Sequence, residues 1–355
     1  MAVLTDEQQM LRDMAAEWVR DRAPVTAFRA LERRGHDPAL WAEMAEMGWA
    51  GVLVPEAQGG VDFGHLSLGI VLEELGRTLV ASPLLSTALL GASALRLGGN
   101  SAHRDQWLPR IAAGEAIVAL ALEGVPPTRL SAGRLNGEQA PVLEAGACSL
   151  IIASACDEQD KLQLLLVDPK AEGVTITRLE RIDGRDAASI TFSDVRIEAD
   201  AMLEGGADLL EHLLDRGRAG LAAEMLGTAE QAFEITLDYL KTRVQFGQLI
   251  GSFQALQHRA VAMKAELVMT RSAVEAALSA IDADTPEVPI LVSLAKALAG
   301  DTLRLVAREM VQLHGGIGMT EEHDAGLYLK RAAAADATWG NSAFHRNRYA
   351  RLTGY

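Results

Sequence analysis

The hydrophobic pattern of this chain changes its period twice, and this order constrains the fold more than any other feature. Apolar residues recur at helical spacing up to about residue 116, and again from about Asp208. Between them, about Ile117–Ile197 consists of short runs rich in Ile, Val, Leu and Thr, separated by Gly, Asp and Pro. We therefore expect a multidomain α+β protein: an N-terminal helical domain over 1–116, a middle β-barrel-like domain over 117–204, and a C-terminal four-helix bundle over 205–355.

Capping residues and apolar stripes predict the individual helices. Thr5 can cap a helix from Asp6 to about Arg22, and Gly48 closes a helix over about Pro38–Met47. Further helices are expected over Leu66–Leu79, Leu84–Leu97, Arg104–Ala113, Ala255–Leu278, Pro289–His314 and Asp324–Ala334, with another from near Ser342. One long helix carries a single stripe made of Leu221, Met225, Thr228, Ala232, Ile235 and Tyr239.

Composition excludes several classes of protein. Hydrophobic residues make up 49% of the 355 residues and charged residues 23%, which excludes a disordered chain. The formal net charge of -15 disfavours binding to nucleic acid or to a membrane surface through a basic face. No apolar run reaches the roughly 18–20 residues of a membrane span, and the N-terminus lacks the apolar core of a signal peptide. We expect a cytoplasmic protein.

The cysteines and histidines do not predict a metal site. Cys148 and Cys156 have no His or Cys partner at metal spacing, so we interpret them as small buried thiols. His314, His323 and His345 are spread over the last third of the chain, and nothing brings three ligands together. We expect surface or capping histidines and no bound metal.

Three segments contain residues suited to ligand binding, and each also has a purely structural interpretation. RVQFGQLIGSFQ (243–254) places a guanidinium, carboxamides and an aromatic ring at a joint, although it could be a helix corner with Phe246 plugging the core. QLHGGIGM (312–319) exposes backbone groups suited to a dinucleotide, although it could simply end a helix. DRGRAGLAAEMLG (215–227) offers Asp215, Arg218 and small residues, which also suit close helix packing.

Taken together, these segments resemble the acyl-CoA dehydrogenase family over essentially the whole chain. PEAQGG, VLEELGR, DxxRxxxAAxxxG, RxQFGxxIxxFQ, QLHGGIG and LYLKRA follow one another in the family's order. The resemblance implies FAD as cofactor, an acyl-CoA thioester as substrate and an electron-transfer flavoprotein as acceptor. It also implies that the flavin's ADP half is bound across a subunit interface.

The resemblance assigns roles to particular residues. Arg243 would contact the pyrophosphate, and Gln245, Phe246 and Gln254 would line the same region. The other side of the adenosine would be held by Gln312, Gly315, Gly316 and Gly318. Arg218 and Asp215 match polar family positions near the thioester and the CoA arm.

Other family positions are altered, so no catalytic base is evident. The family glutamate falls either at Gly217 or in the segment DATWGNSAFHR around Trp339, Gly340 and Asn341. Desaturation needs a carboxylate to remove the α-proton, and neither Gly nor Trp can accept one. The flavin-contacting segments of the β domain are replaced by LEGVPPTRL and, around Pro141–Leu143, by APVLE.

These departures resemble the smaller subunits of the α2β2 acyl-CoA dehydrogenases of actinobacterial steroid side-chain catabolism. Such a subunit would grip the ADP end of a flavin while a partner supplies the glutamate and the ring pocket. Two alternatives stay open: an active homomeric enzyme using Asp215 or Asp336 as base, and a flavin-free scaffold. The identity of the acyl group is not predicted.

Overall fold

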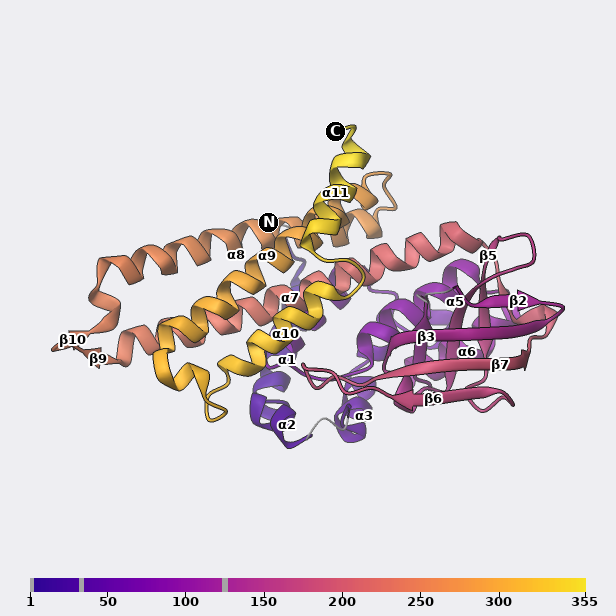
Figure 1. Cartoon of the computed structure of the whole chain (residues 1–355), viewed down its shortest axis with the longest axis horizontal. Helices are drawn as coiled ribbons and strands as arrows, with labels where there is room; N and C mark the ends of the chain where they lie inside the picture. The colour runs from indigo at the N-terminus through magenta and orange to yellow at the C-terminus, as the bar shows by residue number, and fades with distance from the viewer. Residues whose placement is uncertain (1–2, 32–34, 123–126) are drawn as a thin grey trace. The chain divides into compact units, whose positions relative to one another are not determined.

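The computed structural model describes residues 3–31, 35–122 and 127–355. The chain divides into two compact units that interleave in sequence. The first comprises Met1–Phe28, His65–Val80 and Arg218–Tyr355, and the second comprises Arg29–Gly64 and Ala81–Gly217. Each is described by itself below, with the labels of Figure 1.

The first unit is helical. Its elements are α1 (Asp6–Arg22), α4 (Gly64–Arg77), most of α7 (Gly206–Thr242), α8 (Gln254–Asp282), α9 (Val288–His314), α10 (Ala325–Ala337) and α11 (Ser342–Thr353). The helix α9 contacts α8, α10 and α11. The backbones of α4 and α7 touch, because a Cβ added at Gly227 would overlap the carbonyl oxygen of Glu73. A two-stranded hairpin, β9 (Val244–Gln245) with β10 (Gln248–Leu249), joins α7 to α8 (Figure 1).

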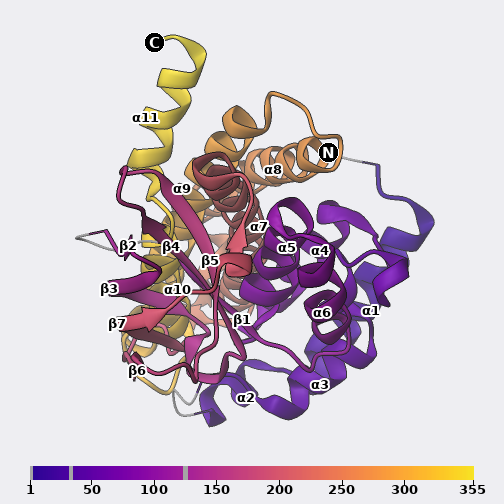
Figure 2. The ribbon, with the colours of Figure 1, turned by 90° about the vertical axis from the view of Figure 1, so that its right-hand side faces the viewer.

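The second unit combines short helices with one sheet. Its helices are α3 (Pro38–Glu46), a π-helix η3 (Leu84–Gly91), α5 (Ala92–Gly98) and α6 (Ser101–Ala112), and α2 (Val25–Ala30) lies at the boundary in sequence. The strands are β1 (Val118–Ala121), β2 (Arg129–Ser131), β3 (Arg134–Leu143), β4 (Leu150–Cys156), β5 (Leu162–Val167), β6 (Val174–Arg178), β7 (Ala187–Arg196) and β8 (Met202–Leu203). They form an eight-stranded sheet in the order β6-β7-β3-β2-β4-β5-β8, with β1 paired to β4 (Figure 2).

Aliphatic side chains form the core of this sheet, as the low aromatic content of 5% requires. Ile151, Leu165, Ile190 and Val195 are fully buried there, and Phe192 is the aromatic member of the cluster. The strand β4 reads as a continuous apolar run, LIIASAC, because it pairs with neighbours on both edges and is buried along nearly its whole length.

The predicted fold class is confirmed. Helices precede the sheet in sequence and helices follow it, as the two changes of period indicate. The helix Asp6–Arg22 has its predicted N-cap, because the Thr5 side chain accepts a hydrogen bond from the backbone of Gln8. The domain boundaries at 116 and 204 stay a prediction. Within the described ranges, no helix is both long and apolar enough to cross a lipid bilayer.

Several local predictions were wrong. The helix expected over Leu84–Leu97 begins as a π-helix, and α2 was not anticipated. The cysteine thiols are half-buried rather than fully buried, although they are free of a disulfide as expected. Four residues of the segment LEGVPPTRL, 123–126, lie outside the described residues.

A buried cluster of charges, which we call the Arg271 cluster, joins three helices of the first unit. The Arg271 guanidinium lies 2.7 Å from a carboxylate oxygen of Glu73 and 2.8 Å from one of Glu230. The cluster contains more carboxylates than guanidiniums. Its members are Glu73, Glu74, Arg77, Glu230, Glu234, Arg271 and Glu275. Burial raises the pKa of Glu74 to about 7, opposed by the Arg77 guanidinium at 3.7 Å, and the repulsion from Glu73 raises it further.

Candidate cofactor-binding site

The segment predicted as a joint is a tight hairpin. Gln245 pairs with Gln248 and Val244 with Leu249, which leaves Phe246 and Gly247 as a two-residue turn. Both turn residues have positive φ, 55° at Phe246 and 78° at Gly247, as the primed turns of two-residue hairpins require. A bulky residue in this left-handed region is strained, and such strain concentrates at binding sites.

The hairpin presents its side chains outward. Phe246 is 90% exposed, so the alternative in which it plugs the core is wrong. Its ring meets that of Phe253 edge to face, with centroids 6.2 Å apart. Arg243 and Gln245 are exposed on the same hairpin, and Gln254 is exposed as the first residue of α8. These four predicted residues therefore lie together at one end of the helices α7 and α8 (Figure 1).

The glycine segment lies at the end of α9, as predicted. The helix ends at His314, and Gly315–Met319 forms a short 3₁₀ turn, η7. Gly315 has φ 64° and ψ −137°, a backbone conformation accessible essentially to glycine. A Cβ added at Gly315 or Gly316 would meet no atom within 4 Å, so packing within this chain does not require glycine at Gly316.

A stack of three rings joins the two segments. The ring centroid of Tyr239, one turn before Arg243, lies 4.3 Å from that of His314, which precedes Gly315. His323 continues the stack at 4.2 Å from His314. The Nδ1 atom of His314 donates to the carbonyl oxygen of Met310 at 2.7 Å, and its pKa is lowered by burial. His314 is 3% exposed, so of the two expectations, surface or capping, the surface position is wrong for it.

The surface at this end is apolar around a few polar groups. Val244, Leu249 and Met319 are exposed by 56%, 44% and 79% respectively. No acidic side chain among the described residues forms an ion pair with Arg243. An exposed apolar surface around an available guanidinium suits an interface with a partner protein, in which an anionic ligand is bound between the two surfaces.

These residues fit the ADP part of a flavin. Arg243 can bind a pyrophosphate bidentately, and the open space over Gly315 and Gly316 lets a planar ligand approach the backbone. Gln245 and Gln312 add exposed carboxamides that can both donate and accept hydrogen bonds. Gly318 differs from the other two glycines, since it is buried and a Cβ there would lie 2.7 Å from the carbonyl oxygen of Val311.

The predicted substrate residues lie far from the hairpin along α7. Asp215 and Arg218 are 3% and 4% exposed. Arg218 donates from Nε to the carbonyl oxygen of Trp339 at 3.1 Å, and its guanidinium lies 5.6 Å from the centroid of the Phe344 ring. Arg218 therefore meets the loop where the resemblance places a catalytic glutamate.

Neither proposed base position carries an available carboxylate. Gly217 is buried within α7, and Trp339 and Gly340 form a turn with positive φ. The Asp336 carboxylate accepts hydrogen bonds from the backbone and hydroxyl of Ser342, at 3.0 and 2.9 Å. Both bonds go to Oδ1, which thus closes the turn between α10 and α11, while Oδ2 lies 3.8 Å from the Arg304 guanidinium.

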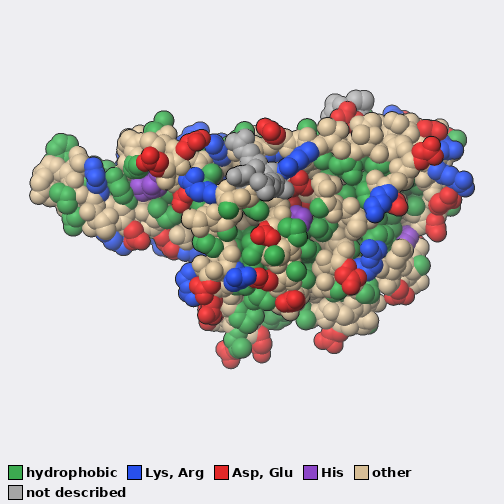
Figure 3. All heavy atoms as spheres, turned by 90° about the horizontal axis from the view of Figure 1, so that it is seen from below, with side chains coloured by type: hydrophobic (Ala, Val, Ile, Leu, Met, Phe, Trp, Pro, Cys, Tyr) green, Lys and Arg blue, Asp and Glu red, His purple; other side chains and the backbone are tan. Residues whose placement is uncertain are grey.

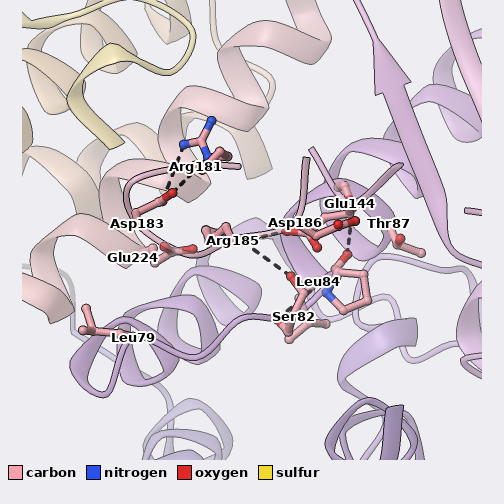
Figure 4. Close-up of polar contacts among 12 residues, drawn as sticks. Leu79, Ser82, Leu84, Thr87, Glu144, Arg181, Asp183, Arg185, Asp186 and Glu224 are labelled. Atoms are coloured by element: carbon pink, nitrogen blue, oxygen red, sulfur yellow. Dashed lines mark hydrogen bonds and ion pairs between the residues drawn. The ribbon is translucent and has the colours of Figure 1, made fainter. Parts of the chain in front are cut away.

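Sequence reasoning missed a buried polar cluster in the second unit. Arg185 lies 3.3 Å from a carboxylate oxygen of Glu144, and Arg181 pairs with Asp183 at 3.0 Å (Figure 4). Asp186 accepts from the backbone of Gly146 at 2.9 Å. The run RIDGRD (181–186) contained the signal, since it holds five charged or flexible residues and a single Ile between two strands. Its contacts organise the β6–β7 connection.

Two family models match this chain. Residues 5–115 match the family described as "Acyl-CoA dehydrogenase, N-terminal domain", and residues 204–353 match "Acyl-CoA dehydrogenase, C-terminal domain". The chain is 34% identical over 330 residues to "Acyl-CoA dehydrogenase IpdE2" of Mycobacterium tuberculosis, covering 92% of this chain and 91% of that protein.

Two solved structures share the fold over nearly the full length. One is the ChsE4-ChsE5 complex from Mycobacterium tuberculosis, with 26% identity, a TM-score of 0.94 and complete coverage of both chains. The other is the Tcur3481-Tcur3483 steroid ACAD, with 30% identity, a TM-score of 0.89 and 98% of each chain covered.

Proposed function

This chain belongs to the acyl-CoA dehydrogenase family, and on that premise we propose that it is one subunit of a heteromeric FAD-dependent enzyme that desaturates an acyl-CoA thioester. Members of this family bind FAD. In the proposal, the hairpin and the glycine turn of this chain bind the ADP half of a flavin. The partner subunit holds the flavin ring and supplies the glutamate.

The observation that carries this proposal is a distance along one helix. Arg218 and Arg243 both lie on α7, separated by 25 residues (243 − 218). At a rise of 1.5 Å per residue, that separation is about 37 Å of continuous helix. An extended FAD is shorter, so one flavin cannot have its pyrophosphate at Arg243 and its ring beside Arg218 of the same chain. The ADP site therefore serves an active site completed by another subunit.

The identity of that subunit follows from the missing carboxylate. A second copy of this chain would repeat Trp339 and Gly340 at the base position and would bring Asp336 in its hydrogen-bonded state. General base catalysis needs a carboxylate that can reach the α-proton. A homologous subunit with a glutamate there meets this need. The similarity to the ChsE4-ChsE5 complex supports a heteromer of two such chains.

Each group of this chain has a defined task in the proposal. Arg243 neutralises the pyrophosphate, and the glycine turn supplies backbone hydrogen bonds where no side chain intervenes. Phe246 covers apolar surface at the interface. When bound, FAD accepts the hydride from the β-carbon of the thioester. An electron-transfer flavoprotein is the proposed acceptor, and a steroid acyl group is the proposed substrate class.

Purification of the chain alone and with a homologous partner tests the proposal. The lone chain is expected to lack flavin, whereas the complex is expected to hold one FAD per pair of subunits, measured by absorbance at 450 nm. In the complex, Arg243→Met is expected to weaken FAD binding about tenfold or more, because a charge-assisted hydrogen bond contributes about 1.5–3 kcal/mol.

Lys241→Met is the matched control, since Lys241 is exposed one turn from the hairpin and carries the same charge. It is expected to retain its flavin. Stoichiometric flavin on the lone chain, together with oxidation of an acyl-CoA by that chain, would refute the heteromeric proposal. Replacing Asp215 and Asp336 by Asn would then identify the base of a homomeric enzyme.

A further inference from the structure

The last helix of the chain buries little apolar surface. Among the 12 residues of α11, Ser342 and His345 are the buried ones, and both are polar. The helix packs chiefly on α9 (Figure 1), where Arg348 donates to the carbonyl oxygen of Pro289 at 3.2 Å and to the Ser293 hydroxyl at 3.0 Å. An element held by so few apolar contacts lies at the low end of local stability, so it can open while the rest of a unit stays folded.

His345 is buried in this contact as a neutral ring. It has no exposed surface, so of the two expectations, surface or capping, the surface position is wrong for it as well. Its Nε2 atom lies 3.1 Å from the carbonyl oxygen of Trp339, and because a carbonyl can only accept, Nε2 carries the proton. Its Nδ1 atom is buried and has no hydrogen-bond partner among the described residues. A second proton would therefore be placed on a buried nitrogen that faces no acceptor, which is costly.

The charges around His345 also oppose a second proton. Burial, together with the positive charges of Lys296 on α9, Arg218 on α7 and Arg348 on α11, lowers the pKa of His345 to about 4. On α10, the Asp336 carboxylate faces Lys296 and accepts from the residue that opens α11. Positive charge therefore prevails around the imidazole.

Two of these cations are fixed in place. The Lys296 ammonium is bonded to three carbonyl oxygens of the turn before α11, those of Ala335, Asp336 and Gly340, at 3.1, 3.2 and 3.1 Å. The Nε atom of Arg218 donates at 3.1 Å to the carbonyl oxygen of Trp339, which also accepts from His345. While α11 stays packed on α9, a protonated imidazole therefore cannot be relieved by turning these groups away.

We propose that α11 is an acid-released helix: protonation of His345 undocks α11 from α9, while the other long helices of the unit stay folded. The inference goes beyond the proposed function and requires neither the flavin nor a partner subunit. In the undocked state the imidazole reaches water, where its second proton is hydrated and the three cations are no longer beside it.

The direction and size of the effect follow from the two states of the ring. Below the ordinary histidine value of 6.5, the undocked form binds a proton that the docked form does not, so undocking becomes more favourable as pH falls to about 4. The difference between these two pKa values raises the undocked fraction by about 300-fold. Lys296 adds no slope in this range, because burial lowers its pKa only to about 8 and it stays protonated.

Hydrogen exchange of the full chain, followed by mass spectrometry from pH 7 to pH 4, tests the proposal. Each measured rate is divided by the intrinsic exchange rate at the same pH, which leaves the protection of the amide. The amides of α11 are expected to lose protection by about tenfold per pH unit below 6.5. The amides of α7 and α9 are expected to keep theirs.

Two variants separate His345 from other acid effects. His345→Gln keeps a donor for the Trp339 carbonyl but cannot take up a proton, so the protection of α11 should no longer depend on pH in this range. His258→Gln is the matched control, since His258 is exposed on α8, and it should keep the wild-type profile. Histidine side chains that reach the surface, such as those drawn in purple in Figure 3, can take up a proton without any opening of the fold.

Three outcomes would overturn the proposal. The first is protection of α11 that does not change between pH 7 and pH 4. The second is a pH dependence that persists in His345→Gln. The third is a loss of protection in α9 in step with α11, because the unit would then be opening as a whole. The wild-type profile decides the first and third whether or not a variant folds.

Discussion

Replacing Glu74 by glutamine is expected to stabilise the protein, but only at neutral and alkaline pH. Glu74 is 7% exposed in the Arg271 cluster, where carboxylates exceed guanidiniums. Its pKa rises from the ordinary 4.5 to about 7, chiefly because burial disfavours the charged form. Between these two pH values the folded state holds a proton that the unfolded state has released, so stability falls as pH rises through this window.

The magnitude follows from the same two values. Ionising a carboxyl whose pKa has risen from 4.5 to about 7 costs about 3 kcal/mol of folding free energy, at about 1.4 kcal/mol per pKa unit. This pKa already includes the attraction to Arg77, whose guanidinium lies 3.7 Å away. Glu74→Gln should therefore raise the free energy of unfolding by about 3 kcal/mol at pH 8, and by nothing measurable near pH 4.

Urea denaturation of the full chain at pH 4, 6 and 8 measures this difference. Glu287→Gln is the matched control, because Glu287 is exposed at the start of α9 and should change stability by less than about 0.5 kcal/mol. An equal effect of Glu74→Gln at pH 4 and pH 8 would refute the reasoning, since it would show that ionisation is not the cause. A loss of stability at pH 8 would show that the carboxylate is adequately paired.

Three further predictions concern other parts of the first unit. Gly227→Ala should lower the free energy of unfolding by about 1–3 kcal/mol because its methyl would overlap the Glu73 carbonyl, whereas Gly326→Ala, with open space around it, should be neutral or stabilising in thermal melts. Phe246→Gly should relieve the backbone strain at φ 55° and stabilise the chain by about 1 kcal/mol. It should nevertheless lower the flavin content of the complex, and an unchanged flavin content would contradict the proposed role of Phe246. Burial lowers the pKa of His345 to about 4, so about 3 kcal/mol of stability should be lost between pH 6.5 and 4, and His345→Gln should abolish that slope.

The sequence determined the elements and their order. The spacing of apolar residues predicted the helices and the strands, because burying one face of an element makes apolar residues recur at that element's own period. Thr5 and Gly315 marked helix ends because capping depends on local backbone groups. The motifs around Arg243 and Gly315 were recognisable for the same reason, since a tight turn and an open backbone require particular residues locally.

Only the tertiary structure decided what these residues do to one another. The exposure of Phe246, the burial of His345 and the three carbonyls around Lys296 depend on helices that are distant in sequence. The sequence does not indicate that the Lys296 ammonium lies within 3.2 Å of the carbonyl oxygens of Ala335, Asp336 and Gly340. The 37-residue length of α7 was encoded locally. The separation between Arg218 and Arg243 could be worked out only once both residues were placed on this one helix.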